Sequence, residues 1–256
     1  MTRLLSGVAL AAAALAAILF LPDLGLRVLA CLVAAAAARE YVQILHSHYP
    51  GPGGAPVLLL VALTCWVMFS PSREGLLVLV LLGVAWVAVE VLFRGLAVDR
   101  AAARSFAIWY IGMPLGMLTA VHARGGEMAT LLLIATIVVS DSGQYYSGRM
   151  FGRYALAPAI SPKKTVEGAV GGLILATAFV VVAGSWVFPL AAPLSLALLG
   201  VAVVALGICG DLFESRLKRT AGVKDSSALI PGHGGLLDRI DALLFATPAF
   251  YLYLQG

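Results

Sequence analysis

The stretch GDLFESRLKRTAGVKDSSALIPGHGGLLDRIDA, residues 210–242, holds five of the chain's thirteen acidic residues and five of its seventeen basic ones. If Asp211 opens a helical turn, three polar residues follow it on the same helix face: Glu214, Ser215 and Lys218. The helix is expected to end at Gly222, and Asp238 and Asp241 open the next apolar segment. Acidic and basic residues gathered at the ends of two helices predict a site for a metal ion and a polyphosphate.

Outside this stretch the composition is that of a membrane protein. Of the 256 residues, 61% are hydrophobic and only 12% are charged, whereas soluble domains average about 25% charged residues. We therefore predict an all-α integral membrane protein with one polytopic domain, residues 1–256. N-terminal helices are expected over about residues 1–104 and catalytic helices over about 105–256. The three cysteines stand alone in apolar runs and predict neither disulfides nor a metal site: Cys31, Cys65 and Cys209.

Nine apolar segments are candidate transmembrane helices, since a span takes roughly 17–25 residues. They cover about residues 4–21, 24–38, 56–70, 75–93, 105–121, 128–146, 166–188, 193–210 and 240–254. The first segment has a signal peptide as its alternative reading. We expect a span there, because its apolar run is long and a second apolar segment follows almost at once.

The basic residues indicate the orientation of these spans. With a cytoplasmic N-terminus, fourteen of the seventeen lie on the inner side, Arg73 and Arg124 lie outside, and Arg27 lies within a span. This distribution follows the positive-inside rule. It places the charged stretches at residues 140–168 and 210–242 on the cytoplasmic side, where nucleotides are available.

Two of the acidic residues within predicted spans are interpreted separately. Glu90 lies four residues before Arg94, at a helical pairing distance. Asp141 has no basic residue four positions away, and a carboxylate inside a membrane is costly and usually functional. Asp141 is therefore a candidate site residue, with a structural hydrogen bond to Ser or Tyr as the alternative.

The segment at residues 140–168 combines basic residues with a predicted helix start. Residues 148–153 (GRMFGR) are expected to form a mobile basic turn, and residues 161–165 (SPKKT) precede a helix that begins near Val166. Backbone N–H groups at a helix start, with two lysines beside them, suit a phosphate group. We favour a phosphate contact for Lys164. For the two arginines of the turn, contact with anionic lipid headgroups is an equal alternative.

The stretch at residues 210–242 supplies the acidic residues. Mg²⁺ is usually bound by one or two carboxylates together with substrate phosphates and water, and Asp211, Asp238 and Asp241 can provide the carboxylates. Four residues can bear the charge of a triphosphate: Lys218, Arg219, Lys224 and Arg239. His233, between glycines, could approach a ligand closely. The alternative is a set of salt bridges between loop charges.

Two glycine pairs have the four-residue spacing that favours close contact between membrane helices. Gly112 with Gly116, and Gly168 with Gly172, stand in apolar surroundings. Such pairs permit close packing either within one subunit or between two.

Three blocks of this sequence resemble the CDP-diacylglycerol synthases, or phosphatidate cytidylyltransferases. The blocks are D-S-G-Q-Y-Y-x-G-R-x-F-G-R from Asp141, S-P-K-K-T-V-E-G from Ser161, and S-R-L-K-R-x4-K-D-S-S-x-x-x-P-x-H-G-G-L-x-D-R-I-D from Ser215. The similarity covers at least residues 140–241. The chain departs from the family at Ser142 and Gln144, where relatives more often carry Thr and Ala, which are mild changes.

The resemblance implies transfer of a cytidylyl group from CTP to phosphatidic acid, giving CDP-diacylglycerol and pyrophosphate in phospholipid biosynthesis. It implies Mg²⁺ as cofactor, with K⁺ as a further candidate ion, and no nucleic-acid partner. It also implies a homodimer among the lipids of the inner (cytoplasmic) membrane, with the active site facing the cytoplasm.

The motifs assign roles to individual residues. Asp211 and Asp238 are the expected metal ligands. The expected catalytic residues are Asp211, Asp238, Asp241, Lys224 and His233. The residues expected to bind the phosphates of CTP or phosphatidate are Asp141, Ser161, Lys164, Thr165, Ser215, Lys218, Arg219, Asp225 and Arg239.

Two other functions compete with this interpretation. A CTP-dependent kinase of a lipid alcohol, such as polyprenol or phytol, has similar charged helix ends but transfers the γ-phosphate; the long third block argues against it. An ion-coupled transporter would use Asp141 and Asp211 as cation sites. It would, however, place its charges near mid-membrane, whereas here they cluster on one side.

Overall fold

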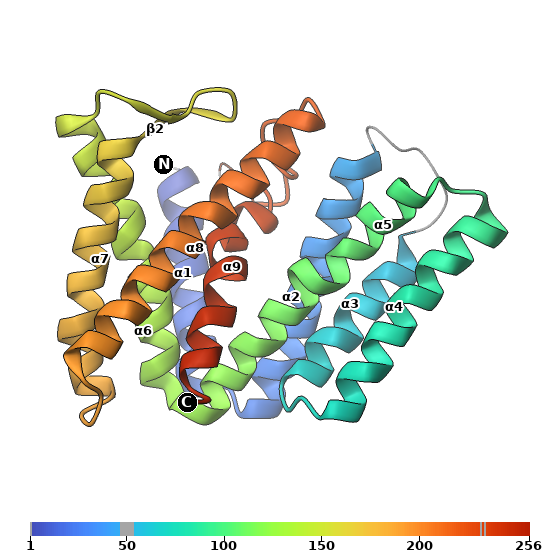
Figure 1. The fold of residues 1–256 in the computed structure, drawn as a ribbon, viewed down its shortest axis with the longest axis horizontal. Helices are drawn as coiled ribbons and strands as arrows, with labels where there is room; N and C mark the ends of the chain where they lie inside the picture. The colour runs from blue at the N-terminus through green and yellow to red at the C-terminus, as the bar shows by residue number, and fades with distance from the viewer. Residues whose placement is uncertain (1, 47–53, 231, 233) are drawn as a thin grey trace. The chain divides into compact units, whose positions relative to one another are not determined.

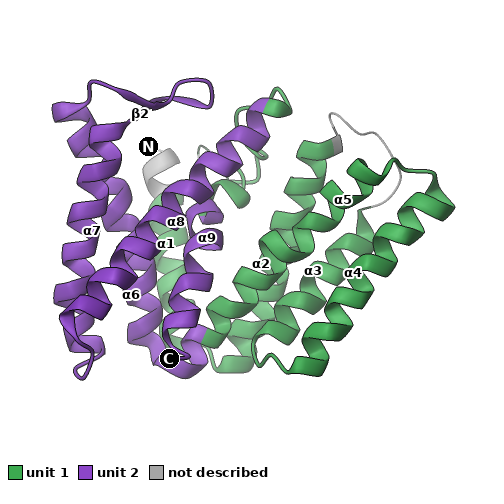
Figure 2. Ribbon diagram, viewed as in Figure 1, with its two compact units in different colours: residues 1–120, 220–239 green, residues 121–219, 240–256 purple. Residues whose placement is uncertain are grey.

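The computed structural model of the protein describes residues 2–46, 54–230, 232 and 234–256. Within these ranges the chain is mainly helical (Figure 1). Two short strands are the exception, β1 (Ala155–Ala157) and β2 (Ser161–Thr165), which pair antiparallel. The chain divides into two compact units, distinguished by colour in Figure 2.

The first unit comprises Met1–Ala120 and Thr220–Arg239. Its helices are α1 (Thr2–Phe20), α2 (Asp23–His46), α3 (Ala55–Met68), α4 (Arg73–Arg94), α5 (Val98–Ala107) and a π-helical turn, η1 (Ile108–Gly112). Gly112 and Gly116 bring their backbone against α3. A Cβ added at Gly112 would lie 2.7 Å from the carbonyl oxygen of Val61, and one at Gly116 would meet that of Cys65. The first glycine pair therefore serves packing within the chain.

A buried ion pair joins α4 to α5 in this unit. Glu90 and Arg104 are 0% and 1% exposed, and Arg104 Nη1 lies 3.3 Å from Glu90 Oε1. Arg94 reaches the same oxygen at 3.8 Å, as the four-residue spacing predicts. The nearer partner, Arg104, comes from the next helix along the chain.

The second unit comprises Val121–Arg219 and Ile240–Gly256. It holds β1, β2 and the helices α7 (Val166–Val187), α8 (Pro193–Thr220) and most of α9 (Leu237–Tyr253). Helix α6 (Met113–Phe151) begins before Val121 and continues through this unit, with a break at Gly126. Gly126 has φ +74°, a left-handed backbone conformation that glycine adopts readily. This break separates the two spans predicted over 105–121 and 128–146.

Helices α6 and α7 are in backbone contact. A Cβ added at Gly168 would lie 2.8 Å from the carbonyl oxygen of Gln144, and one at Gly172 would lie 2.8 Å from that of Ser140. The second glycine pair thus also packs within the chain. Because α6 runs to Phe151, the mobile turn predicted over residues 148–153 is wrong for residues 148–151, which are helical.

By length and composition, five helices within the described residues could cross a membrane. They are Asp23–Leu45, Arg73–Arg94, Val98–Phe151, Val166–Val187 and Pro193–Thr220, and two shorter apolar helices are Ser6–Phe20 and Ala55–Met68. Large apolar side chains are exposed along α4, including Leu81, Leu92 and Phe93, as on a lipid-facing surface. The fold is that of a multi-pass helical membrane protein. The count of nine spans, their orientation and the single-domain organisation stay predictions.

Candidate active site

A cavity of about 480 Å³ opens in the second unit, within the size range of small-molecule sites. Four elements line it: the end of α6, strand β2, the start of α7 and the middle of α8. The lining residues are Asp141, Gln144, Tyr145, Gly148, Arg149, Ser161, Lys163, Lys164, Thr165, Gly168, Ala169 and Asp211. The structure therefore brings together five residues predicted for the site, Asp141, Ser161, Lys164, Thr165 and Asp211, from segments far apart in the sequence.

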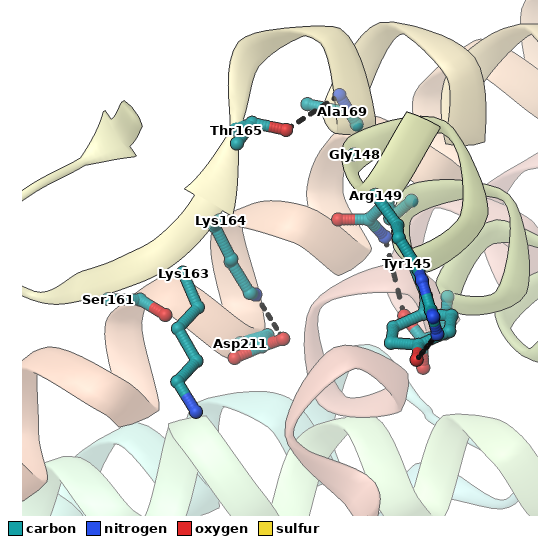
Figure 3. A pocket seen from close by; sticks show the side chains of 12 residues that line it. Tyr145, Gly148, Arg149, Ser161, Lys163, Lys164, Thr165, Ala169 and Asp211 are labelled. Carbon is teal, nitrogen blue, oxygen red and sulfur yellow. Dashed lines mark hydrogen bonds and ion pairs between the residues drawn. The ribbon is translucent and has the colours of Figure 1, made fainter. Parts of the chain in front are cut away.

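Lys164 and Asp211 form an ion pair in the wall of this cavity (Figure 3). Their side chains are only 22% and 32% exposed. Because water screens partly buried charges less than exposed ones, this attraction is stronger than that of a surface pair. Ser215 lies one helical turn after Asp211 and its hydroxyl donates to Asp211 Oδ1 at 3.3 Å. Asp211 and Ser215 therefore lie on the same face of α8, as predicted. The carboxylate of Asp211 is paired with the ammonium group of Lys164.

The other polar side chains of the cavity come mostly from α6. Arg149 Nη1 donates to the hydroxyl of Tyr145 at 3.1 Å, and Gln144 Nε2 donates to Asp141 Oδ1 at 3.3 Å. The cavity lining contains three basic residues and two acidic ones: Arg149, Lys163, Lys164, Asp141 and Asp211. A cavity wall with excess positive charge raises the local concentration of anions.

The start of α7 has fewer unbonded backbone N–H groups for an anion than the sequence predicts. The hydroxyl of Thr165 caps the helix by accepting from Gly168 N at 3.1 Å. Val166 N donates to the carbonyl oxygen of Tyr154 at 2.9 Å. Two of the first amide groups are therefore already bonded within the protein. The expectation that this helix start offers these two amides to a phosphate is wrong. Basic side chains remain in the cavity lining, from β2 and from Arg149 of α6.

Three further predicted residues, Lys218, Arg219 and Asp241, lie in the same unit as the cavity. Lys218 Nζ is 2.5 Å from Glu214 Oε2, and Arg219 Nε donates to the carbonyl oxygen of Ile160 at 3.4 Å. Asp241 of α9 interacts electrostatically with Asp211, Asp141 and Lys218. Asp241 is therefore within electrostatic range of carboxylates on α8 and α6.

The first unit holds the loop that follows α8. Asp238, near the start of α9, accepts three hydrogen bonds at Oδ2: from Ser226 N at 2.9 Å, Ser226 Oγ at 2.9 Å and Gly235 N at 2.8 Å. The contact to Gly235 reaches back three residues, as in a helix capping box. The loop is therefore folded around the carboxylate of Asp238.

Glu40 of α2 is a second acid that accepts hydrogen bonds from this loop, and sequence reasoning missed it. Its carboxylate accepts hydrogen bonds from Ser226, Ser227, Leu236 and Leu237. The sequence did contain a feature that could have identified Glu40 as a candidate, because no basic residue lies four positions away from it. The same criterion singled out Asp141.

The remaining predicted residues lie in the same unit. Lys224, Asp225 and Arg239 are exposed. A Cβ added at Gly234 would lie 3.4 Å from the Cβ of Asp225. His233 lies outside the described residues.

The donor set suits a hard divalent cation. Within the described residues there is no group of three or more His, Cys, Asp or Glu side chains close enough to hold a metal ion. Mg²⁺ needs only one or two protein carboxylates when substrate phosphates complete its coordination. Asp211, beside a bound ammonium group, and Asp238, oriented by three donors, have the chemistry of such ligands. Their assignment as metal ligands stays a prediction.

Comparison with known proteins identifies the family. The sequence profile of the cytidylyltransferase family matches residues 1–256. The phosphatidate cytidylyltransferase of Thermotoga maritima is 31% identical over 232 residues, covering 85% of this chain and 78% of that protein. The phosphatidate cytidylyltransferase of Haemophilus influenzae is 50% identical over 130 residues, but this match covers only 48% of this chain and 45% of that protein.

A third relative, an Escherichia coli protein named uncharacterized protein YnbB, is 35% identical over 240 residues. That match covers 88% of this chain and 77% of the relative. The profile spans the whole chain, and two relatives above 30% identity align over more than three quarters of their own length. The chain therefore belongs to the cytidylyltransferase family.

Proposed function

We propose that the protein is a phosphatidate cytidylyltransferase. A phosphate oxygen of phosphatidic acid attacks the α-phosphorus of CTP, the bond from that phosphorus to the β-phosphate oxygen breaks, and CDP-diacylglycerol and pyrophosphate result. The observation that carries this proposal is the family match over residues 1–256, together with the extended similarity to the T. maritima enzyme. The basic cavity of the second unit is consistent with a substrate that carries several phosphates.

The proposed reaction does not require a strong general base. The attacking phosphate monoester is already ionised at neutral pH, so catalysis consists of aligning two anions and neutralising charge on the α-phosphate and the leaving group. Lys163, Lys164 and Arg149 can supply that positive charge from the cavity wall. Lys164 neutralises Asp211 in this structure, and its ammonium group would be available to a phosphate if Asp211 held a divalent cation instead.

We further propose that Mg²⁺ is the cofactor, with Asp211 and Asp238 as its protein ligands and Asp241 close by. When bound, the ion would neutralise phosphate oxygens and help to align the nucleotide. Asp141, Ser161, Thr165, Ser215, Lys218, Arg219, Lys224, Asp225, His233 and Arg239 are proposed to contact phosphates or to hold groups that do. K⁺ as a second ion and a homodimeric state belong to the same proposal.

The site is proposed to face the cytoplasm at the inner membrane. The distribution of basic residues supports this orientation, with fourteen on one side of the predicted spans. A site at the membrane–water boundary allows a lipid and a water-soluble nucleotide to meet.

Purified protein in detergent, incubated with Mg²⁺, phosphatidic acid and CTP labelled separately in the α- and γ-phosphates, tests the reaction. A cytidylyltransferase gives α-label in the lipid and γ-label in pyrophosphate. A lipid-alcohol kinase, supplied with polyprenol, instead gives γ-label in the lipid and unlabelled lipid from α-labelled CTP. The second pattern, or no transfer to either acceptor, would contradict the proposal.

A further inference from the structure

Glu40 has no part in the proposed chemistry, yet its carboxylate gathers a segment almost two hundred residues away in sequence. We infer that Glu40 is a positioning residue: it fixes the loop before α9 and, through Ser226, the orientation of the Asp238 carboxylate. The inference rests on the proposed function in one respect, namely that Asp238 binds the catalytic metal ion. It assigns the N-terminal helices a role in the active site.

Four donors surround the Glu40 carboxylate. Oε1 accepts from Ser227 Oγ at 2.6 Å and from Leu236 N at 3.0 Å. Oε2 accepts from Ser226 Oγ at 2.9 Å and from Leu237 N at 2.8 Å. Glu40 itself is only 4% exposed. A buried carboxylate is tolerated only where donors replace its water, and here the loop provides all four of these donors.

Two of the donors are backbone amides at the start of α9. The first amides of a helix have no carbonyl partner within the helix, and negative charge is favourable there. Helices usually satisfy these amides with a side chain that immediately precedes them. Glu40 does so from α2, so the start of α9 depends on a residue of another helix.

Ser226 connects the two acids. Its Oγ lies 2.9 Å from Glu40 Oε2 and 2.9 Å from Asp238 Oδ2, so the single hydroxyl proton is shared between the two carboxylates. Its backbone amide also donates to Asp238 Oδ2. Hydrogen bonds to a ligand's carboxylate fix its orientation toward a metal ion. Moving Glu40 therefore moves Ser226, and with it two of the three donors that hold Asp238.

Gly235 shows how closely the loop and Glu40 fit. A Cβ added at Gly235 would lie 2.7 Å from the Glu40 carboxyl carbon and would also collide with Ser226 Oγ. The Gly235 amide donates to Asp238 Oδ2. The carboxylate of Glu40 is held by its four donors and cannot withdraw without breaking them.

The test compares three variants of the full-length protein in detergent: Glu40→Gln, Ser226→Ala and Ser227→Ala. The glutamine keeps the size of Glu40 but presents an NH2 group to one pair of donors. Ser226→Ala removes the hydroxyl that bridges Glu40 and Asp238, while the backbone amide of residue 226 can still donate to Asp238. Ser227→Ala is the matched control, because it removes the shortest hydrogen bond to Glu40 but none to Asp238.

Two measurements are made on each variant: Mn²⁺ binding by electron paramagnetic resonance in the presence of CTP, and the Mg²⁺ dependence of kcat and of KM for CTP. Glu40→Gln and Ser226→Ala are expected to weaken Mn²⁺ binding and raise the Mg²⁺ requirement by about tenfold or more, the usual effect of losing a group that orients a metal ligand. Ser227→Ala is expected to stay within about threefold of the wild type.

A wild-type Mn²⁺ affinity in Glu40→Gln or Ser226→Ala would overturn the inference, as would an equal loss in Ser227→Ala. If Glu40→Gln fails to fold, the Mn²⁺ affinities of Ser226→Ala and Ser227→Ala decide between the inference and its rejection. Failure of the proposed function is separately visible, because the wild type would then make no CDP-diacylglycerol, while Mn²⁺ binding still reports on Glu40.

Discussion

Lys164 of strand β2 forms an ion pair with Asp211 of helix α8 in the cavity of the second unit. Its ammonium group is thus paired with a carboxylate that is predicted to bind a metal ion. Lys163 lines the same cavity one residue earlier. The two lysines have the same chemistry but different neighbours, and they are a natural comparison.

We predict that Lys164→Met lowers kcat/KM for CTP by about tenfold to a hundredfold, since a hydrogen bond to a charged group contributes roughly 1.5–3 kcal/mol. Lys163→Met should have a clearly smaller effect. Steady-state kinetics of both variants at saturating phosphatidate provides the measurement. An equal loss of kcat/KM in the two variants would show that the cavity wall acts only through its total charge.

Asp211→Asn and Asp238→Asn should each reduce turnover by at least about a hundredfold, because neutralising a metal ligand removes several kcal/mol of charge stabilisation. Both proteins should remain folded, as judged by size-exclusion chromatography in detergent. Asp99→Asn, at the start of α5, is a control outside the site. Near-normal activity of either variant across a Mg²⁺ titration would refute the metal assignment.

The buried pair of Glu90 and Arg104 should matter for stability. Arg104→Met is expected to lower the free energy of unfolding by about 3 kcal/mol, since it leaves a buried carboxylate with only Arg94 nearby. The double variant Glu90→Leu/Arg104→Met should recover much of this loss. Denaturant unfolding of the purified protein measures both, and a double variant less stable than Arg104→Met would contradict the prediction.

Gly172→Ala should lower both the melting temperature and the activity. The new methyl group would meet the carbonyl oxygen of Ser140, so α7 would be forced from α6, whose C-terminal part lines the cavity. Gly83→Ala is the matched control, because its Cβ would have no neighbour nearer than 3.5 Å. Alanine favours helix by about 1 kcal/mol over glycine, so Gly83→Ala should be neutral or slightly stabilising. A Gly172→Ala protein with wild-type melting and activity would disprove the tight contact.

The sequence predicted the helical class, because long apolar runs leave few other solutions in a membrane. It also predicted that the charged helix ends at Gly222, whose φ is +69°; α8 ends two residues earlier, at Thr220. The hairpin at residues 155–165 was missed, because β1 has only three residues and β2 is short, mostly polar and contains a proline, without the alternation that marks a strand. Strand β2 nevertheless carries Lys164.

The candidate site was predictable only in part. Charged motifs identified the acids and lysines, because their residue types suit phosphate and metal chemistry. The partners of those residues depend on tertiary structure, and no local pattern links Glu40 to Ser226 or Lys164 to Asp211. The cap formed by Thr165 was hidden for the same reason, since one hydroxyl serves equally as a helix cap or as a ligand contact.

The capped start of α7 has a consequence for the phosphate binding proposed for the cavity. Rigid backbone amides fit one arrangement of oxygens, whereas an ammonium group on a flexible stem binds as a mobile point charge. Because Val166 N and Gly168 N are bonded within the protein, the proposed phosphate binding would rely on side chains of the cavity wall, namely Arg149, Lys163 and Lys164. Under the proposed function, the two lysines would be able to follow a phosphate chain as it changes from bound nucleotide to departing pyrophosphate.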